Sequence, residues 1–345
     1  MVTDSIVGQL QSDVVALAVQ GGRPVGSAGH RLAREHLVER LQSLGLEPAL
    51  GESFELPYQG RSTAGRGVEF TNLVGRLPGS VPGLAPLLLV AHYDTCGATP
   101  GADDNAAAVA ILLSVVEPLR AAGLQRDVWF AFPDAEEPPY CLGPDMGSTR
   151  LYTDQLPPGQ GVHCGIVFDL CGHDVAVPGC QDMLVVAGVE TSPVLAKVVE
   201  VQGPAPVPGV RVVPTLTCYI GDRSDYHVLR THQCPYLFLS CGEWAHYHGS
   251  GDTPEKLNYG KMAGIARYVE GLVRSLGGDP GGGAAAGDVP EPDAGLPWGL
   301  GAFDTTALEL AYLKEVLGPL AAGVHDRQGI DALALRLRAA MYGAG

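Results

Sequence analysis

The sequence contains few basic residues and no long apolar run. Lys and Arg number 22 against 38 Asp and Glu in 345 residues, so the formal net charge is −16. A nucleic-acid-binding face requires positive charge, so we expect no nucleic-acid partner. The longest apolar run, residues 106–116, is shorter than the about 20 residues of a membrane span, and residues 1–19 lack the pattern of an export signal. These absences predict a cytoplasmic protein with no membrane partner.

Paired cysteines and several catalytic motifs are also missing. The eight cysteines include no Cys-x-x-Cys pair, which argues against a zinc ribbon or a redox motif and favours reduced thiols. The chain has no Gly-x-Ser-x-Gly, no His-Glu-x-x-His and no Gly-rich phosphate-binding loop. The sequence therefore gives no support to a serine hydrolase of the elbow type, a zincin or a nucleotide-binding protein.

What is present is an alternation of short apolar runs with longer helical patterns. A turn is followed by a predicted helix that ends near Gly45 and carries an apolar stripe of Leu32, Leu37, Leu41 and Leu44. Further helices are predicted at 105–119, 192–201 and 259–276, and strands at 87–91, 128–132, 165–170, 183–189 and 235–240. This alternation is typical of an α/β sheet with helices on both faces.

Composition divides the chain into three parts. Residues 1–276 contain the alternating pattern, and residues 277–301 have the Gly, Ala and Pro content of a linker. Residues 302–345 are predicted to form a short helical appendage, in which Asp304 or Thr305 could cap a helix carrying Leu308, Tyr312, Val316 and Leu320. The appendage is too small for a core of its own, so we expect it to dock on the main domain or to join two copies as a homo-oligomer.

Acidic residues and histidines follow successive predicted strands. Each taken alone is typical of a structural histidine, a helix cap or a solvated surface. Open α/β sheets, however, bind ligands at the carboxyl edge of the strands. We therefore expect these side chains to converge: His92, Asp94, Asp104, Glu136, Glu137, Asp169 and His248.

Imidazole and carboxylate groups together suit zinc or a similar divalent ion. A single catalytic zinc needs three protein ligands, whereas this chain offers five, namely His92, Asp104, Glu137, Asp169 and His248. The surplus predicts two metals about 4 Å apart that share one carboxylate. Glu136 is then left over as a general base. His246 is the alternative to His248, and we expect the nearby Cys96, Cys171 and Cys241 to be buried neutral thiols.

These residues belong to ordered blocks in which the chain resembles the co-catalytic zinc exopeptidases of the aminopeptidase type, a family that also contains the glutaminyl cyclases. The resemblance covers residues 26 to about 276. The blocks are Gly26-Ser27-Ala28-Gly29, Asn72-Leu73-Val74-Gly75, His92-Tyr93-Asp94, residues 101–105, Glu136-Glu137, Gly147-Ser148, Asp169, Ser224-Asp225, Tyr247-His248 and Asp252-Thr253.

The resemblance implies a role for each matching residue. One zinc would be held by His92, Asp104 and Asp169, and the other by Asp104, Glu137 and His248, with Asp104 and not Asp103 as the bridge. Asp94 would orient the imidazole of His92, Glu136 would be the general base, and Tyr247 would hydrogen-bond the oxyanion. The implied fold has a mixed, mostly parallel sheet, and residues 1–276 would be the catalytic domain of an aminopeptidase with two zinc ions per chain.

The chain departs from the family pattern beside the proposed site. Nine residues, 138–146, separate Glu137 from Gly147, where the aminopeptidases usually have fewer, and Ala106-Ala107-Ala108 replaces the usual Ser-Gly after Asn105. A lengthened segment at 138–146 also occurs in glutaminyl cyclases, which bind one zinc and cyclise an N-terminal glutamine.

The cyclase is therefore an alternative, while Asn105 after Asp104 and Tyr247 before His248 favour the peptidase. A non-catalytic binding module on the same fold is a third reading, against which the complete ligand set argues. The peptidase reading predicts a peptide or aminoacyl small-molecule substrate.

Overall fold

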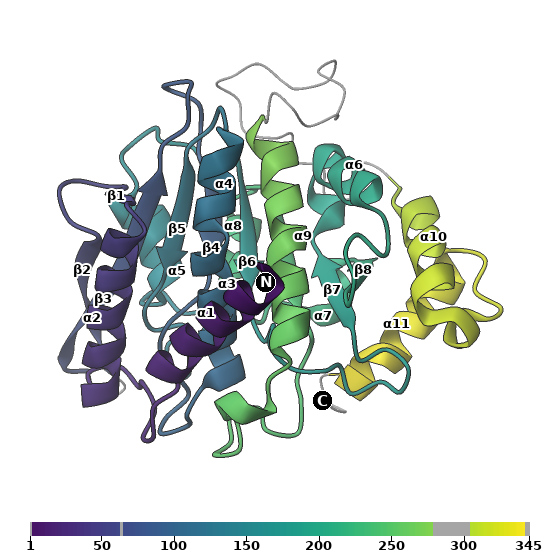
Figure 1. The fold of residues 1–345 in the computed structure, drawn as a ribbon, viewed down its shortest axis with the longest axis horizontal. Helices are drawn as coiled ribbons and strands as arrows, with labels where there is room; N and C mark the ends of the chain where they lie inside the picture. Colours follow the sequence, from purple (N-terminus) through teal and green to yellow (C-terminus); the bar gives the residue numbers. More distant parts are fainter. Residues whose placement is uncertain (1, 63–64, 279–303, 342–345) are drawn as a thin grey trace.

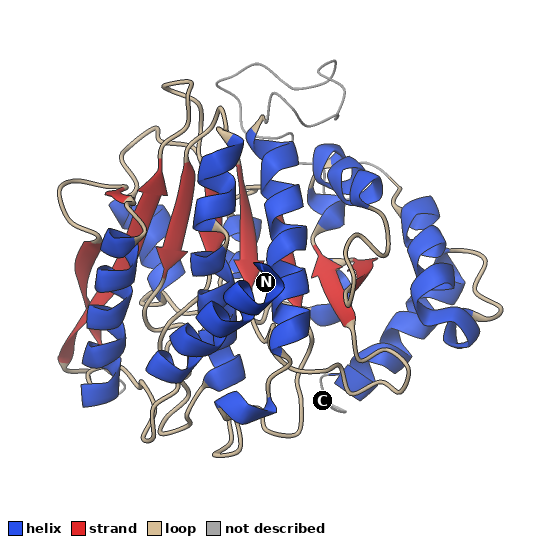
Figure 2. Cartoon of the chain, viewed as in Figure 1, coloured by secondary structure: helices blue, strands red, loops and turns tan. Residues whose placement is uncertain are grey.

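A mixed β-sheet runs through the middle of the protein, and Figure 2 shows its strands as one layer between helices. The structure, a computed structural model, describes residues 2–62, 65–278 and 304–341. Within these residues the sheet has nine strands in the order β1-β3-β5-β4-β6-β9-β7-β8, with β2 also paired to β3. The strands are β1 Glu47–Pro48, β2 Glu55–Arg61, β3 Gly67–Leu77, β4 Leu87–Val90, β5 Val128–Phe132, β6 Cys164–Phe168, β7 Met183–Ala187, β8 Arg211–Thr215 and β9 Tyr236–Ser240.

The four middle strands, β5, β4, β6 and β9, are parallel, and every residue in them is buried. Leu87 of β4 pairs with Val128 of β5 and with Cys164 of β6. Because the three strands start in register and have similar lengths, their carboxyl ends lie at one edge of the sheet. Antiparallel pairings join β1, β2 and β5 to β3, and β7 to β9.

Helices cover both faces of the sheet, which confirms the expected α/β fold (Figure 1). One face carries α1 Val2–Leu17, α2 Ala28–Ser43, α3 Ala108–Ser114, α4 Val116–Ala122 and α9 Tyr259–Gly277. The other carries α5 Gly147–Arg150 and α8 Tyr226–Thr231. Near β8 lie α6 Pro193–Gln202, α7 Thr217–Ile220, α10 Thr306–Leu317 and α11 Arg327–Met341.

The helical segment Ala102–Ala122 is long and apolar. By length and composition it could cross a membrane, but 72% of the apolar window is buried inside the protein. Every residue of α3 is buried, and α3 contacts both α1 and α9. Its apolar character is that of a helix in the core of the fold.

The predicted stripe on α2 is partly wrong. Leu37 and Leu41 are fully buried, but Leu32 is 59% exposed, and the buried positions nearer the start of the helix are His30 and Ala33. At 100° per residue Leu32 lies about 140° around the helix from Leu37, so it points to solvent. Helix α1 and the hairpin of β2 with β3 are elements that the sequence pattern did not predict.

The C-terminal appendage docks on the main domain. Leu313, Val316 and Ile330 are buried, and the hydroxyl of Tyr312 donates to the carbonyl of Val199. Arg211 of β8 donates to the carbonyl of Val316 at 2.6 Å. Homo-oligomer formation through these helices stays a prediction, and most of the predicted linker lies outside the described residues.

Candidate metal centre

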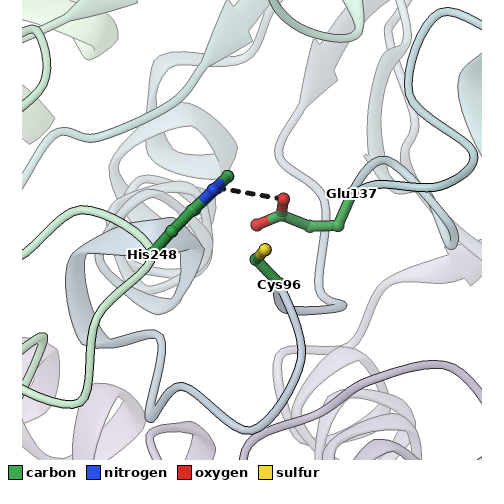
Figure 3. Close-up of side chains that lie close together, drawn as sticks. All are labelled: Cys96, Glu137 and His248. Atoms are coloured by element: carbon green, nitrogen blue, oxygen red, sulfur yellow. Dashed lines mark ion pairs between the residues drawn. The ribbon is translucent and has the colours of Figure 1, made fainter.

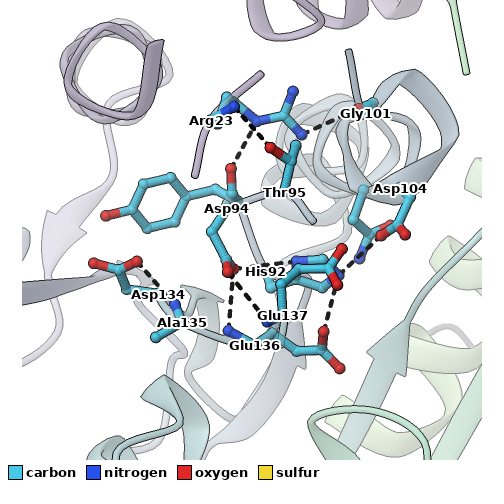
Figure 4. Close-up of polar contacts among 12 residues, drawn as sticks. Arg23, His92, Asp94, Thr95, Gly101, Asp104, Asp134, Ala135, Glu136 and Glu137 are labelled. Carbon is cyan, nitrogen blue, oxygen red and sulfur yellow. Dashed lines mark hydrogen bonds and ion pairs between the residues drawn. The ribbon is translucent and has the colours of Figure 1, made fainter. Parts of the chain in front are cut away.

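The carboxyl edge of the middle strands gathers most of the predicted site residues (Figure 4). His92 stands two residues after β4, Asp169 directly follows β6, and Glu136 and Glu137 lie on the loop after β5. Asp104 comes from the irregular helix Ala102–Ala107 that precedes α3. His248 comes from the loop between β9 and α9.

His92 is the centre of the first group. Its Nε2 atom lies 3.4 Å from Oδ1 of Asp104 and 3.7 Å from Oδ1 of Asp169. One donor atom from each of these three residues falls within 4.8 Å of the others, and the three side chains form a group that could hold a metal ion. His92 is fully buried, and its other nitrogen, Nδ1, lies 3.3 Å from Asp94.

His248 is the centre of the second group. Its Nε2 atom lies 3.2 Å from Oδ2 of Asp104 and 3.1 Å from Oε2 of Glu137. The two carboxylate oxygens of Asp104 therefore face different histidines, Oδ1 toward His92 and Oδ2 toward His248. A carboxylate placed in this way has the geometry of a bridge between two cations.

The structure distinguishes the proposed ligands Asp104 and His248 from Asp103 and His246, which lie close to them in the sequence. Asp103 accepts hydrogen bonds from the backbone of Gly172 and pairs with His173, both at 2.6 Å, so it faces away from the histidines of the site. His246 packs edge-on against Trp244, whereas His248 contacts the carboxylates. The ring of Tyr247 stacks on that of His248, with 3.8 Å between centroids.

Two carboxylates hold the loops that carry the site. Asp94 accepts hydrogen bonds from the backbone N–H groups of Glu136 and Glu137, both at 3.1 Å. Asp252 accepts from the N–H groups of Asp103 at 2.7 Å and Asp104 at 3.1 Å. The sequence analysis assigned no role to Asp252, although the Asp252-Thr253 block was a signal that it matters.

Arg23 is a further residue that the sequence analysis missed. Its side chain is fully buried and donates to the carbonyls of Tyr93 at 2.7 Å, Leu17 at 2.8 Å, and Pro100 and Gly101 at 3.0 Å. These bonds join the loop of His92 to the loop that leads to Asp104 (Figure 4). No local pattern marks Arg23, because its partners lie up to 78 residues away.

Three non-glycine residues at the site have left-handed backbones. They are Ala135 before Glu136, Leu170 after Asp169, and His248, with φ values of 55°, 55° and 52°. Residues other than glycine seldom adopt this region, and such conformations cluster at functional sites, where the surrounding structure enforces them. Here the turn at Ala135 precedes the proposed base Glu136, the turn at Leu170 follows the proposed ligand Asp169, and the third falls on the proposed ligand His248.

The electrostatics of the cluster indicate a need for positive charge. Burial, with the nearby charge of Asp169 adding to it, raises the pKa of Glu136 well above its ordinary value. Burial and the charge of Asp104 raise the pKa of Glu137 to about 8. Burial disfavours the charged form of His248, but its contacts with Asp104 and Glu137 outweigh this and raise its pKa to about 11. Crowded carboxylates of this kind are stabilised by cations.

The donor atoms fit zinc. Among the described residues, Nε2 of His92, Oε1 of Glu137 and Oδ1 of Asp169 are buried without a hydrogen-bond partner. Buried polar atoms normally have partners, so these atoms are available for another ligand. Imidazole nitrogen and carboxylate oxygen are ligands that zinc accepts. Glu136 also falls in a group with His92 and Glu137 that could hold a metal.

The fold and the donor set define the class as an α/β protein with a divalent-metal site at one edge of its sheet. The family model of peptidase family M28 matches residues 72–273, which is more than half of the chain. The chain therefore belongs to peptidase family M28. A curated relative, the uncharacterized protein YfbL of Escherichia coli K12, is 28% identical in an alignment of 224 residues that covers 56% of this chain and 68% of that protein.

Solved structures share the fold at low sequence identity. The LapA aminopeptidase of Legionella pneumophila superposes with a TM-score of 0.63 at 15% identity, covering 80% of this chain and 73% of LapA. A Zn-dependent exopeptidase from Parabacteroides distasonis gives 0.59 at 16% identity, covering 79% and 98%. The glutaminyl cyclase of Porphyromonas gingivalis gives 0.58 at 19% identity, covering 78% and 97%. These similarities show that the fold is shared. Proteins with this fold include both peptidases and glutaminyl cyclases.

Proposed function

We propose that the protein is a zinc-dependent aminopeptidase that hydrolyses the N-terminal bond of a peptide or aminoacyl substrate. The observation that carries the proposal is the placement of Asp104, whose two oxygens face His92 and His248 separately. Membership of peptidase family M28 and the buried, unpartnered donor atoms support it. His92, Asp104 and Asp169 would hold one zinc, and Asp104, Glu137 and His248 the other.

The chain's own side chains account for the proton transfers. Zinc held by these residues would supply Lewis acidity for the substrate carbonyl and for the attacking water. Glu136 is buried beside His92, with its Oε2 atom 3.7 Å from Nε2 of that ring. In the proposed reaction it takes a proton from the attacking water and returns it to the departing amine as the C–N bond breaks. Its position beside His92 suits a group that accepts a proton and then donates it during the reaction.

Two further residues have supporting roles in this proposal. Asp94 contacts Nδ1 of His92 and so orients the ring toward the other ligands. Tyr247 is stacked on His248, and burial raises the pKa of its hydroxyl. A hydroxyl that stays protonated can donate a hydrogen bond to the oxyanion that forms at the substrate carbonyl.

A glutaminyl cyclase is the second candidate. The observation that favours it is the loop of residues 138–146 directly after the proposed ligand Glu137, where Tyr140 packs edge-on against Phe70. A loop in that position could enclose a glutaminyl side chain and reshape a peptidase pocket. The fold shared with a bacterial glutaminyl cyclase is compatible with this activity.

One experiment separates the two candidates. The purified protein is assayed for zinc content and for turnover of aminoacyl chromogenic substrates and of a peptide with N-terminal glutamine. Two zinc ions per chain and release of the amino acid would support the aminopeptidase. One zinc ion per chain and formation of pyroglutamate would instead identify the protein as a cyclase. If the protein neither binds zinc nor turns over either substrate, a non-catalytic binding module is the remaining reading. His248→Ala is expected to lower the zinc content by one ion per chain if the two-zinc site is correct.

A further inference from the structure

Cys96 lies against the second group of proposed ligands. Its Sγ atom and donor atoms of Glu137 and His248 all lie within 4.8 Å of one another. Figure 3 shows the three side chains pointing toward a common centre from three separate loops. Cys171 and Cys241 are buried, as expected, but Cys96 is only partly buried, so the expectation of a buried thiol at this position is wrong.

The backbone holds Cys96 in this place. The N–H of Arg23 donates to Oγ1 of Thr95 at 2.7 Å, and that hydroxyl donates to the carbonyl of Gly97 at 3.0 Å. The carbonyl of Cys96 itself accepts a hydrogen bond from Thr99 at 3.0 Å. The backbone of the loop is therefore fixed on both sides of Cys96. Rotation about the Cα–Cβ bond of Cys96 is enough to change the direction of its sulfur atom.

A second observation points to a ligand at the same place. The Oε1 atom of Glu137 is buried with no hydrogen-bond partner among the described residues, and Glu137 is only 3% exposed. Nitrogen, oxygen and sulfur donors thus surround one small volume. The half-buried thiol, the imidazole and the buried carboxylate together form a donor set that zinc accepts.

We propose that Cys96 is a thiolate ligand of the metal held by Asp104, Glu137 and His248. This inference rests on the two-metal site proposed above and adds a residue that the family pattern does not supply. On binding, the S–H bond breaks, a sulfur–metal bond forms, and the proton is released to solvent.

The added ligand makes the two metal positions unequal. Asp104, Glu137, His248 and Cys96 together offer four protein ligands, the number found in closed zinc sites, whereas His92, Asp104 and Asp169 offer the three of an open site. A soft sulfur donor also makes the site at Cys96 selective for thiophilic ions such as Cd²⁺ over hard ions such as Mn²⁺.

Cobalt substitution of the full-length protein tests the proposal without relying on activity. Cobalt(II) bound to a thiolate has an intense near-ultraviolet charge-transfer band, whereas its weaker visible bands report occupancy with any ligand. We expect the charge-transfer band in the wild type and its loss in Cys96→Ser and Cys96→Ala, with visible bands remaining in both variants. Cys141→Ser is the matched control, because Cys141 is also partly buried on a loop near the site, and it should keep the band.

Metal competition is the second measurement. The ratio of Cd²⁺ to Mn²⁺ affinity should fall at least about tenfold in Cys96→Ser, which corresponds to about 1.4 kcal/mol, and should not change in Cys141→Ser. Cobalt bound to the wild type without a thiolate band, or a band that survives in both Cys96 variants, would overturn the inference and leave the two-metal site standing. A wild type that binds no cobalt would instead refute the metal centre as a whole and this ligand with it.

Discussion

Adjacent acidic residues in this protein have different partners because the backbone turns between them. Asp104 has φ −111° and ψ 85°, values outside the helical region, although helical turns flank it. The turn directs Asp103 toward His173 and Asp104 toward His92 and His248. An acid at this edge of the sheet is therefore structural or metal-facing according to its local backbone conformation.

Glu136 provides the sharpest test at the scale of single residues. Glu136→Gln keeps the size of the side chain and removes its ability to accept a proton. We expect kcat to fall by about 10² to 10⁴, the usual contribution of a positioned base, while zinc content stays at the wild-type value. Steady-state kinetics and metal analysis of the same preparation check this. Loss of zinc in the variant would show instead that Glu136 is a ligand, as its contact with His92 allows.

Arg23 should matter to both stability and metal affinity. Arg23→Met leaves the carbonyls of Tyr93 and Pro100 without their donor, and each unpaired buried group costs about 1–3 kcal/mol. We expect the free energy of unfolding to fall by roughly 3 kcal/mol or more and zinc to bind more weakly, because both loops carry proposed ligands. Arg23→Lys should give a smaller loss.

Urea denaturation of the zinc-loaded protein and competition with a chelator measure the two effects. Arg31→Met is the matched control, since Arg31 is exposed and exposed substitutions usually change stability by less than about 0.5 kcal/mol. Unchanged stability and zinc affinity in Arg23→Met would contradict the positioning role.

At the scale of elements, the C-terminal helices are joined by an ion pair between a buried carboxylate and an arginine whose side chain is 32% exposed. Glu309 of α10 is 1% exposed and accepts hydrogen bonds from Nη2 of Arg327 at 2.8 Å, from Nη1 at 3.0 Å and from Thr305 at 2.6 Å. Arg327 begins α11, so the pair joins the two helices. The pair fixes α10 and α11 relative to each other, whereas the contact with β8 comes from Arg211, which donates to the carbonyl of Val316.

The ion pair predicts a strong coupling between the two helices. Arg327→Met leaves the Glu309 carboxylate buried and unpaired, which costs about 3–5 kcal/mol. Adding Glu309→Gln should recover part of this loss, because a neutral amide needs no counter-charge. Urea denaturation of the four proteins of the double-mutant cycle measures the coupling.

The exposed pair Lys197–Glu200, at 2.6 Å with side chains 69% and 55% exposed, is a suitable control. Lys197→Met should cost less than about 1 kcal/mol. A similarly small loss in Arg327→Met would mean that the ion pair does not hold α10 and α11 together.

At the scale of the whole molecule, the metal centre joins loops from distant parts of the chain. Removal of zinc by a chelator should lower the melting temperature, because zinc binds the folded site. Free zinc at 1,000 times its dissociation constant raises the free energy of unfolding by about 4.1 kcal/mol. The carboxylates at the site also repel one another without a cation. A decrease on the order of 5 °C is expected for a chain of this size.

Differential scanning calorimetry before and after chelation, followed by zinc readdition, checks this expectation. His248→Ala, which is proposed to lose one metal, should show a smaller decrease on chelation than the wild type. Complete zinc removal with an unchanged melting temperature would contradict a metal centre that contributes to stability.

The middle of the fold was predictable from local pattern. Residues 87–90, 128–132 and 236–240 are continuous apolar runs, and each is a fully buried strand. The convergence of His92, Glu137 and Asp169 followed from the same pattern, because parallel strands bring their carboxyl ends to one edge. The exposed Leu32 and the missed β2–β3 hairpin lie outside this central pattern, where burial depends on neighbours that local sequence does not reveal.

The sequence by itself determined the family, the strand runs and the kinds of donor atoms available, since these depend on residue identity and short spacing. Only the tertiary structure decided that Arg23 joins two loops, that Asp252 holds the turn at Asp104, that Cys96 approaches His248, and that the appendage docks on β8. These contacts join residues separated by 70 to more than 150 positions. Their partners are chosen by packing of the complete fold, so no local pattern could specify them.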